Sequence, residues 1–219
     1  PLPRGIGDPV MKNPLHYQLS EYDCGPTTML NAVSYLFERE EIPPELIRNV
    51  MLYSLDCYGK GGAPCKAGTS RMAMMFLANW LDGYGQATSL PLSSVYLAGK
   101  AVSVRPESRV LDALHRGGVA VVRLFYEVEH YTLFTGVTEH GIELFDPWYV
   151  PADSQEFAGT GIELTLAHPF AYNRVVPFSY FECENCSNYA LGTIEDREAV
   201  LLFNEQTKRT AADTIEYFI

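Results

Sequence analysis

The sequence lacks a long hydrophobic run, although 47% of its 219 residues are hydrophobic. No segment approaches the ~18 consecutive apolar residues that a membrane-spanning helix needs, so we expect no membrane segment and no membrane partner. Basic residues are also scarce, because 16 Lys and Arg stand against 27 Asp and Glu and leave a formal net charge of −11. Phosphate binding needs clustered Lys and Arg, so we also expect no nucleic-acid partner.

A secretory signal and an even set of cysteines are also missing. Residues 1–10 contain no apolar core segment and begin without methionine, whereas Met11-Lys12-Asn13 resembles a natural start. We therefore interpret residues 1–10 as an expression leader or disordered extension. Five cysteines in a chain without a secretory signal favour reduced thiols over a disulfide framework. We expect a cytoplasmic protein with one domain over residues 11–219, whose C-terminal third, residues 151–219, we leave unassigned in role.

Helical patterns come first along the chain and strand patterns follow. Apolar periodicity and turn residues predict helices over 24–38, 43–55, 70–81 and 106–116, with Gly83 ending the third. The predicted strands are 94–97, 119–126, 130–137, 142–145 and 199–203. Short connections make the three consecutive strands after residue 118 antiparallel neighbours. Helices followed by an antiparallel sheet indicate the α+β class.

Two of the predicted helices have apolar faces that we expect to be buried. In the second helix this face comprises Leu46, Ile47, Val50 and Met51. In the third helix it comprises Met72, Met75, Phe76, Ala78 and Trp80. The Met-rich part of the third helix is interpreted as core, with a peptide groove as the alternative.

Cys24 stands where a loop becomes the first helix. Asp23 is a suitable cap for that helix, and Pro26 is tolerated only in a first turn. Unpaired backbone N–H groups and the positive end of the helix dipole meet there, which favours the nucleophilic thiolate. Gln18 lies six residues earlier, where its amide is a candidate donor to an oxygen on the attacked carbon.

A cysteine nucleophile needs a base and a group that orients the base. Of the five histidines, His130 stands out because it begins a predicted strand directly after a turn. Asp146 closes the next predicted strand, just before Pro147. In an antiparallel pair, the start of the first strand lies beside the end of the second. We therefore expect His130 and Asp146 to meet at one edge of the sheet.

These residues resemble a known family. Gln18-x4-Asp23-Cys24-Gly25-Pro26-Thr27 resembles the N-terminal signature of family thirty-nine cysteine peptidases, which include domains that remove double-glycine leaders from bacteriocin precursors. His130-Tyr131 with Thr135-Gly136-Val137 resembles the family's histidine strand, and Asp146-Pro147 resembles its aspartate turn. The resemblance implies a papain-like fold and a peptide or protein substrate. It also implies Cys24 as nucleophile, His130 as general base and then acid, Asp146 as orienting group and Gln18 as oxyanion donor.

Two alternatives share this set of residues. The same triad serves an acyltransferase or amidase, and a domain of this fold without turnover would be a peptide-binding module. We expect no cofactor and no metal, although Cys57, Cys65, Cys183 and Cys186 allow a zinc site or disulfides as less favoured alternatives to free thiols. The oligomeric state is left open.

Overall fold

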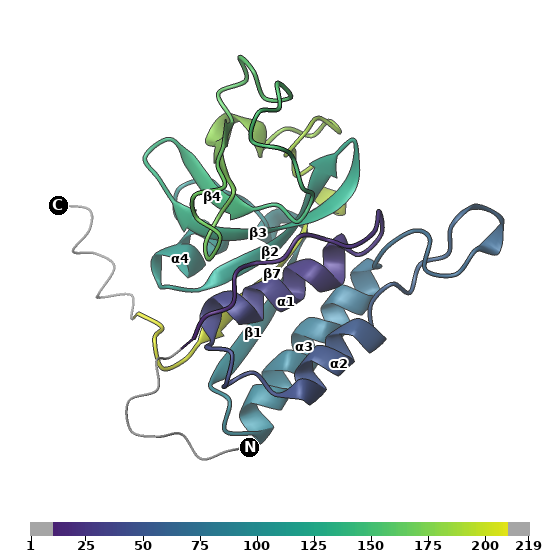
Figure 1. Ribbon diagram of the computed structural model, residues 1–219, viewed down its shortest axis with the longest axis vertical. Helices are drawn as coiled ribbons and strands as arrows, with labels where there is room; N and C mark the ends of the chain where they lie inside the picture. Colours follow the sequence, from purple (N-terminus) through teal and green to yellow (C-terminus); the bar gives the residue numbers. More distant parts are fainter. Residues whose placement is uncertain (1–10, 210–219) are drawn as a thin grey trace.

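A seven-stranded antiparallel sheet forms the centre of the computed structural model, which describes residues 11–209 (Figure 1). The helices are α1 (Cys24–Leu36), α2 (Pro44–Leu52), α3 (Arg71–Ala87) and α4 (Arg109–His115). The strands are β1 (Leu92–Ala98), β2 (Val119–Tyr126), β3 (Val128–Val137), β4 (Gly141–Phe145), β5 (Glu163–Leu164), β6 (Arg174–Pro177) and β7 (Glu198–Asn204). The α+β prediction is confirmed. The predicted leader, residues 1–10, lies outside the described residues.

The strand order is β1-β7-β2-β3-β4-β6-β5, and every neighbouring pair is antiparallel. The prediction that β2, β3 and β4 are consecutive antiparallel neighbours is confirmed. A single residue, Glu127, separates β2 from β3, and its φ of 59° makes the tight turn. Strands β5 and β6 come from the stretch whose role was left unassigned, and β6 pairs directly with β4.

Both faces of the sheet are buried, because successive residues of each strand point to opposite sides. Val119 and Val121 of β2 belong to the core that α1, α2 and α3 cover. Ala120 and Val122 belong to a second core, which α4 and the chain after β4 cover. Figure 1 shows α1, α2 and α3 together on one side of the sheet and α4 on the other.

Helix α3 corrects two predictions. Its Ser70 cap forms as expected, with the Ser70 side chain accepting from the backbone N–H of Ala73, but the helix continues past Gly83 to Ala87. Near its end a Cβ at Gly85 would lie 1.8 Å from the carbonyl oxygen of Leu92, so glycine is needed there because β1 passes close by.

The buried face of α3 also differs from the prediction. Met74 and Leu77 are fully buried, whereas Met72 and Phe76 are 68% and 45% exposed. Apolar residues occur nearly all round this helix, so its periodicity did not select one face. In α2, half of the predicted stripe is buried, because Leu46 and Val50 lie in the core while Ile47 and Met51 are exposed. The other predicted helices shorten at their ends without changing place.

The loop between α2 and α3 projects from the body of the molecule (Figure 1) and is closed at its base. Asp56 accepts from the backbone N–H of Ser70 at 2.7 Å and from its hydroxyl at 2.5 Å. The backbone N–H of Cys57 donates to the carbonyl of Gly68 at 3.3 Å, and that of Leu55 donates to the Thr69 hydroxyl at 3.2 Å. These contacts form the neck of the loop.

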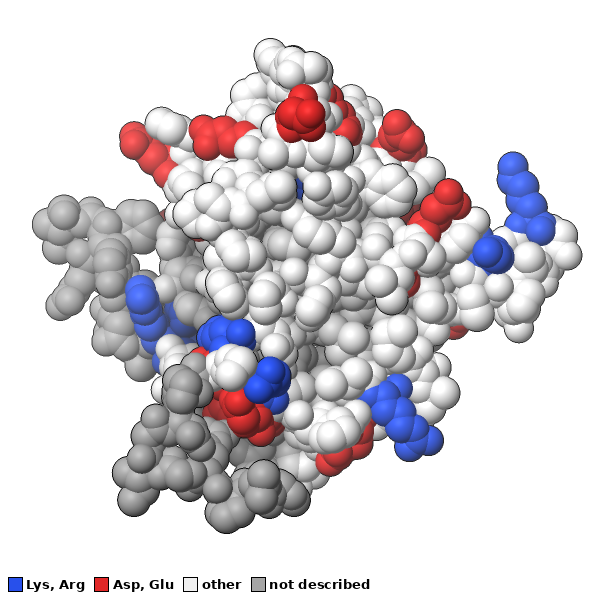
Figure 2. Space-filling view, in the orientation of Figure 1, with Lys and Arg blue, Asp and Glu red and all other residues white. Residues whose placement is uncertain are grey.

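The surface matches the composition of the chain. On the face in Figure 2, acidic side chains lie mainly around the edge and uncharged residues fill the centre. Among residues 11–209, no helix is both long enough and apolar enough to cross a membrane.

Candidate active site

Strand β3 places His130 at the end of the sheet. His130 is opposite Leu124 in the pairing with β2, three residues from the Glu127 turn. Its ring is 6% exposed and lies 5.9 Å, centroid to centroid, from the ring of Tyr126. The strand begins two residues earlier than predicted, at Val128, and the position of His130 near the turn is retained.

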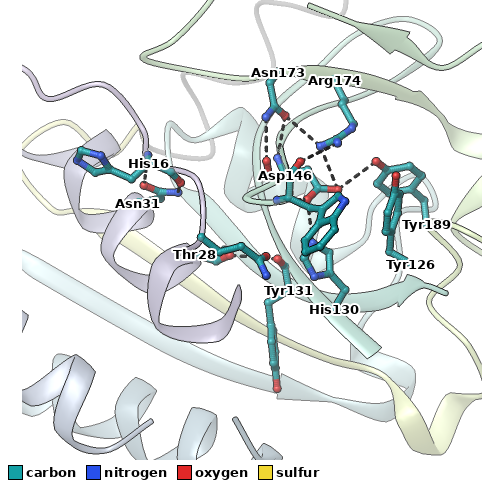
Figure 3. A network of polar contacts seen from close by, with 12 residues as sticks. His16, Thr28, Asn31, Tyr126, His130, Tyr131, Asp146, Asn173, Arg174 and Tyr189 are labelled. Carbon is teal, nitrogen blue, oxygen red and sulfur yellow. Dashed lines mark hydrogen bonds and ion pairs between the residues drawn. The ribbon is translucent and has the colours of Figure 1, made fainter. Parts of the chain in front are cut away.

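Asp146 follows the last residue of β4 and is completely buried. Its Oδ1 lies 2.8 Å from Nε2 of His130, as Figure 3 shows. The backbone N–H of Trp148 donates to the same oxygen at 2.8 Å. The expected meeting of His130 and Asp146 at one edge of the sheet is confirmed. Because Nε2 is held by the carboxylate, Nδ1 is the ring nitrogen left for another partner.

Three residues that the sequence analysis did not single out hold Asp146 in place. Asn173 brackets its backbone, accepting from the Asp146 N–H and donating to the Asp146 carbonyl, both at 2.8 Å. Nη1 of Arg174 lies 3.0 Å from Oδ2 of Asp146, and the Tyr189 hydroxyl donates to Oδ2 at 3.1 Å (Figure 3). All three side chains are buried. They come from residues 151–219, whose role was left unassigned, and Arg174 followed by two valines was the available sign there of a strand with a buried charge.

Cys24 is the first residue of α1 and is 7% exposed. It is close enough to His130 to act on the ring electrostatically, so the structure brings all three predicted triad residues together. Thr28, one turn later, donates to the carbonyl of Tyr131 at 3.1 Å and so fixes the helix beside the histidine strand. Gly25 leaves room for α3, because a Cβ there would lie 2.7 Å from the Thr69 hydroxyl oxygen.

Asp23 occupies the N-cap position of α1 as predicted, but its side chain does not cap the helix. Its carboxylate makes no side-chain cap to α1 and instead accepts from the backbone N–H groups of Leu19 and Ser20, at 2.8 and 2.6 Å. It also accepts from the Thr27 hydroxyl at 3.2 Å. The aspartate therefore closes the loop before the helix onto its first turn. Burial raises the pKa of Asp23, but the hydrogen bonds from Ser20, Leu19 and Thr27 outweigh it and lower that pKa overall.

Gln18 lies on the same loop, but its amide is occupied. Its Nε2 donates to the carbonyl of Ser20 at 2.6 Å, and its backbone N–H donates to the carbonyl of Pro147 at 2.9 Å. Its Oε1 is buried and has no hydrogen-bond partner among the described residues. The structure therefore places Gln18 beside the aspartate turn, with one Nε2 hydrogen donated to the Ser20 carbonyl.

The charges in the site stabilise one another. Burial lowers the pKa of His130, but the Asp146 carboxylate and then Cys24 raise it, to about 10. Burial raises the pKa of Asp146, but Arg174 and then His130 lower it, to about 2. At neutral pH the histidine is therefore an imidazolium and the aspartate a carboxylate.

A cavity of about 450 Å³ opens beside Cys24. Its walls come from the loop before α1, the end of the projecting loop, and the β2–β3 turn. The lining residues are Glu21, Tyr22, Cys24, Ala67, Gly68, Phe125, Val128 and Glu129. Cys24 therefore lines a space whose walls are partly aromatic and aliphatic and include two carboxylates.

The other four cysteines are unpaired, half-buried or exposed. Within residues 11–209, no three His, Cys, Asp or Glu side chains lie close enough together to hold a metal ion. The four-cysteine zinc alternative is therefore not formed in this part of the chain.

No protein-family model matches this chain, and no curated protein matches it. The resemblance to family thirty-nine cysteine peptidases therefore rests on the residues of the chain itself.

Proposed function

We propose that this protein is a papain-like cysteine peptidase in which Cys24, His130 and Asp146 form the catalytic triad. The observation that carries the proposal is the buried contact of Asp146 with His130, with Cys24 beside the imidazole at the start of a helix and at the wall of a cavity. A cysteine with a purely structural role needs neither an imidazolium partner nor an open space. The cytoplasmic location stays a prediction.

The first chemical step follows from the charges. The Cys24 thiolate attacks the carbonyl carbon of a peptide bound in the cavity, forming a C–S bond and placing negative charge on the carbonyl oxygen. The backbone N–H of Cys24 is a donor for this oxyanion, because the first N–H groups of an α-helix have no intrahelical acceptor. Gln18 becomes a second donor when its amide turns away from the Ser20 carbonyl.

His130 then acts as an acid. As the C–N bond breaks, its electron pair goes to the nitrogen, which takes the proton from the imidazolium, and the oxyanion pair restores the carbonyl as a thioester. The neutral imidazole next removes a proton from water, which attacks the thioester and releases the acid. Asp146 keeps Nε2 occupied throughout, so that Nδ1 faces the reacting atoms.

The sharpest test compares five thiols in one molecule. Reaction with iodoacetamide followed by peptide mass spectrometry gives a rate for each cysteine, and the four others are internal controls. We expect Cys24 to react fastest below pH 7, and to lose this advantage in His130→Gln. If Cys24 reacts no faster than the exposed Cys65 and Cys186, the protein is not a cysteine enzyme of this kind.

Turnover is tested with a peptide library analysed by mass spectrometry, with Cys24→Ala as the control. Cleaved peptides that appear only with the unaltered protein support the peptidase. Products that appear only when an amine acceptor is added assign the acyltransferase alternative instead. Peptide binding without any product, together with a slow Cys24, assigns the binding module.

A further inference from the structure

Arg174 is a buried cation whose charge is balanced at the candidate active site. It is fully buried at the start of β6, with Nη1 on Asp146 at 3.0 Å and Nη2 donating to the carbonyl of Trp148 at 2.9 Å. Its guanidinium carbon lies 6.0 and 5.4 Å from the ring centroids of Tyr126 and Phe157. Burying a charge is costly unless an opposite charge compensates for it, and Asp146 is the carboxylate in contact with this one.

The two oxygens of Asp146 serve different partners. Oδ1 faces His130 and the Trp148 N–H, whereas Oδ2 faces Arg174 and the Tyr189 hydroxyl. One carboxylate is therefore shared between two cations, one on each side. Arg174, Asp146 and His130 therefore form a row of alternating charges, positive, negative and positive, that ends beside Cys24.

This row of charges affects how easily His130 gives up its proton. A carboxylate that serves an imidazolium alone holds its proton strongly, and that proton must leave when the C–N bond of the substrate breaks. The charged and titratable groups that face the His130 ring are Asp146 from β4, Cys24 from α1 and Tyr126 from β2. Arg174 and Tyr189 act on the ring through Asp146.

We propose that Arg174 is a positioning residue that draws off part of the Asp146 charge and so lets His130 release its proton to the leaving nitrogen. The proposal rests on the proposed function for its role in turnover. The effect of Arg174 on the pKa of the His130 ring, however, can be measured without any substrate.

The test is an NMR titration of the His130 ring in the full chain, assigned by comparison with His130→Gln. Removing the cation in Arg174→Met or Arg174→Gln should raise the pKa of His130 by about one unit. Arg174→Lys keeps the charge and should shift it by less than half as much. Two charge-removing variants keep the test available if one of them fails to fold. An unchanged or lowered pKa in the folded charge-removing variant overturns the proposal.

Arg197 provides a matched control. It is also a buried arginine on a carboxylate, with Nη1 2.8 Å from Glu182, and it contacts none of the triad residues in the described contacts. Arg197→Met should reduce stability and leave the His130 titration in place. An equal shift in this variant would mean that general loosening moves the titration, and the proposal would then be wrong.

Activity measurements separate this proposal from the proposed function. If the unaltered protein cleaves peptides, the high-pH limb of kcat/KM should move upward in Arg174→Met together with the NMR titration. If the unaltered protein cleaves nothing, the peptidase proposal fails while the shift of the His130 titration still supports the role of Arg174. Cleavage with no shift in either measurement overturns the Arg174 proposal alone.

Discussion

Two neighbouring residues of β3 each meet a buried carboxylate, on opposite faces of the sheet. His130 contacts Asp146, and Tyr131 donates its hydroxyl to Glu198. Both carboxylates are almost completely buried. Asp146 has the imidazole at 2.8 Å and the Arg174 guanidinium at 3.0 Å. The two sites therefore share a strand and a burial depth, and they differ in the groups that face the carboxylate.

Two tyrosine hydroxyls and one more distant guanidinium face Glu198. Tyr96 donates to Glu198 at 2.8 Å, and the Arg71 Nε lies 4.0 Å away. Burial and Glu198 raise the pKa of Tyr131 well above its usual value and that of Tyr96 to about 12. These hydroxyls keep their protons at any ordinary pH, so the site joins β1, β3 and β7 without moving a proton. Burial alone therefore does not distinguish the two carboxylates; Asp146 differs in having a histidine partner that lies beside Cys24 at the wall of a cavity.

The largest effect on the cleavage rate is expected from removing the Cys24 sulfur, which lies on the His130 side of the comparison. Cys24→Ala should reduce peptide cleavage by about 10⁴-fold or more, because no other group on that side can form the thioester. The measurement is kcat/KM on a peptide identified in the library. Cys183→Ala, at a half-buried thiol outside the site, should leave the rate unchanged. Equal losses in both variants would contradict the assignment of Cys24.

The next effect compares the two carboxylates directly. Asp146→Asn should lower kcat/KM by about 10²–10⁴-fold, because the imidazole loses its orienting charge. Glu198→Gln replaces a residue of similar burial and should lower it by less than about 10-fold, because the hydroxyls of Tyr96 and Tyr131 and the Arg71 guanidinium face it, and no histidine does. Circular dichroism of both variants separates activity from folding. A larger loss in Glu198→Gln would reverse the distinction between the two sites.

The free energy of unfolding at low pH provides a further test of the Asp146 side of the comparison. The pKa of Asp146 is lowered from 3.8 to about 2, so the stability it contributes is present above 3.8 and is lost as the pH falls through about 2. This contribution is about 2 kcal/mol by linkage. Urea unfolding between pH 4 and pH 2 should show a shallower decline in Asp146→Asn than in the unaltered protein. Glu139→Gln, at a fully solvated carboxylate, should keep the original slope.

The smallest effect is spectroscopic. Glu198→Gln should lower the pKa of Tyr96 from about 12 toward its usual value, because the carboxylate that disfavours the phenolate is gone while burial remains. Ultraviolet difference absorbance in alkaline solution follows phenolate formation. Tyr96→Phe identifies the transition that belongs to this residue. A transition that stays near pH 12 in Glu198→Gln would assign the shift to burial alone.

The part of the fold and site that the sequence predicted depends on short connections. The turns between β2, β3 and β4 are short enough to force antiparallel pairing, and this alone brings His130 to Asp146. Arg174 could not be found in this way, because β6 reaches β4 only after a long irregular connection. The face of α3 was missed because that helix is apolar nearly all round, and the Gln18 amide direction depends on one local hydrogen bond.

Because the projecting loop is closed at its neck, sequence changes at its tip and sequence changes near its base should have different consequences. Asp56 and Ser70 fasten the base of the loop, so its tip is an appendage whose length and composition can vary without loosening either helix. Ala67 and Gly68, just inside that neck, line the cavity beside Cys24. Exchanging the loop would therefore reshape one wall of this cavity while leaving Cys24, His130 and Asp146 where they are.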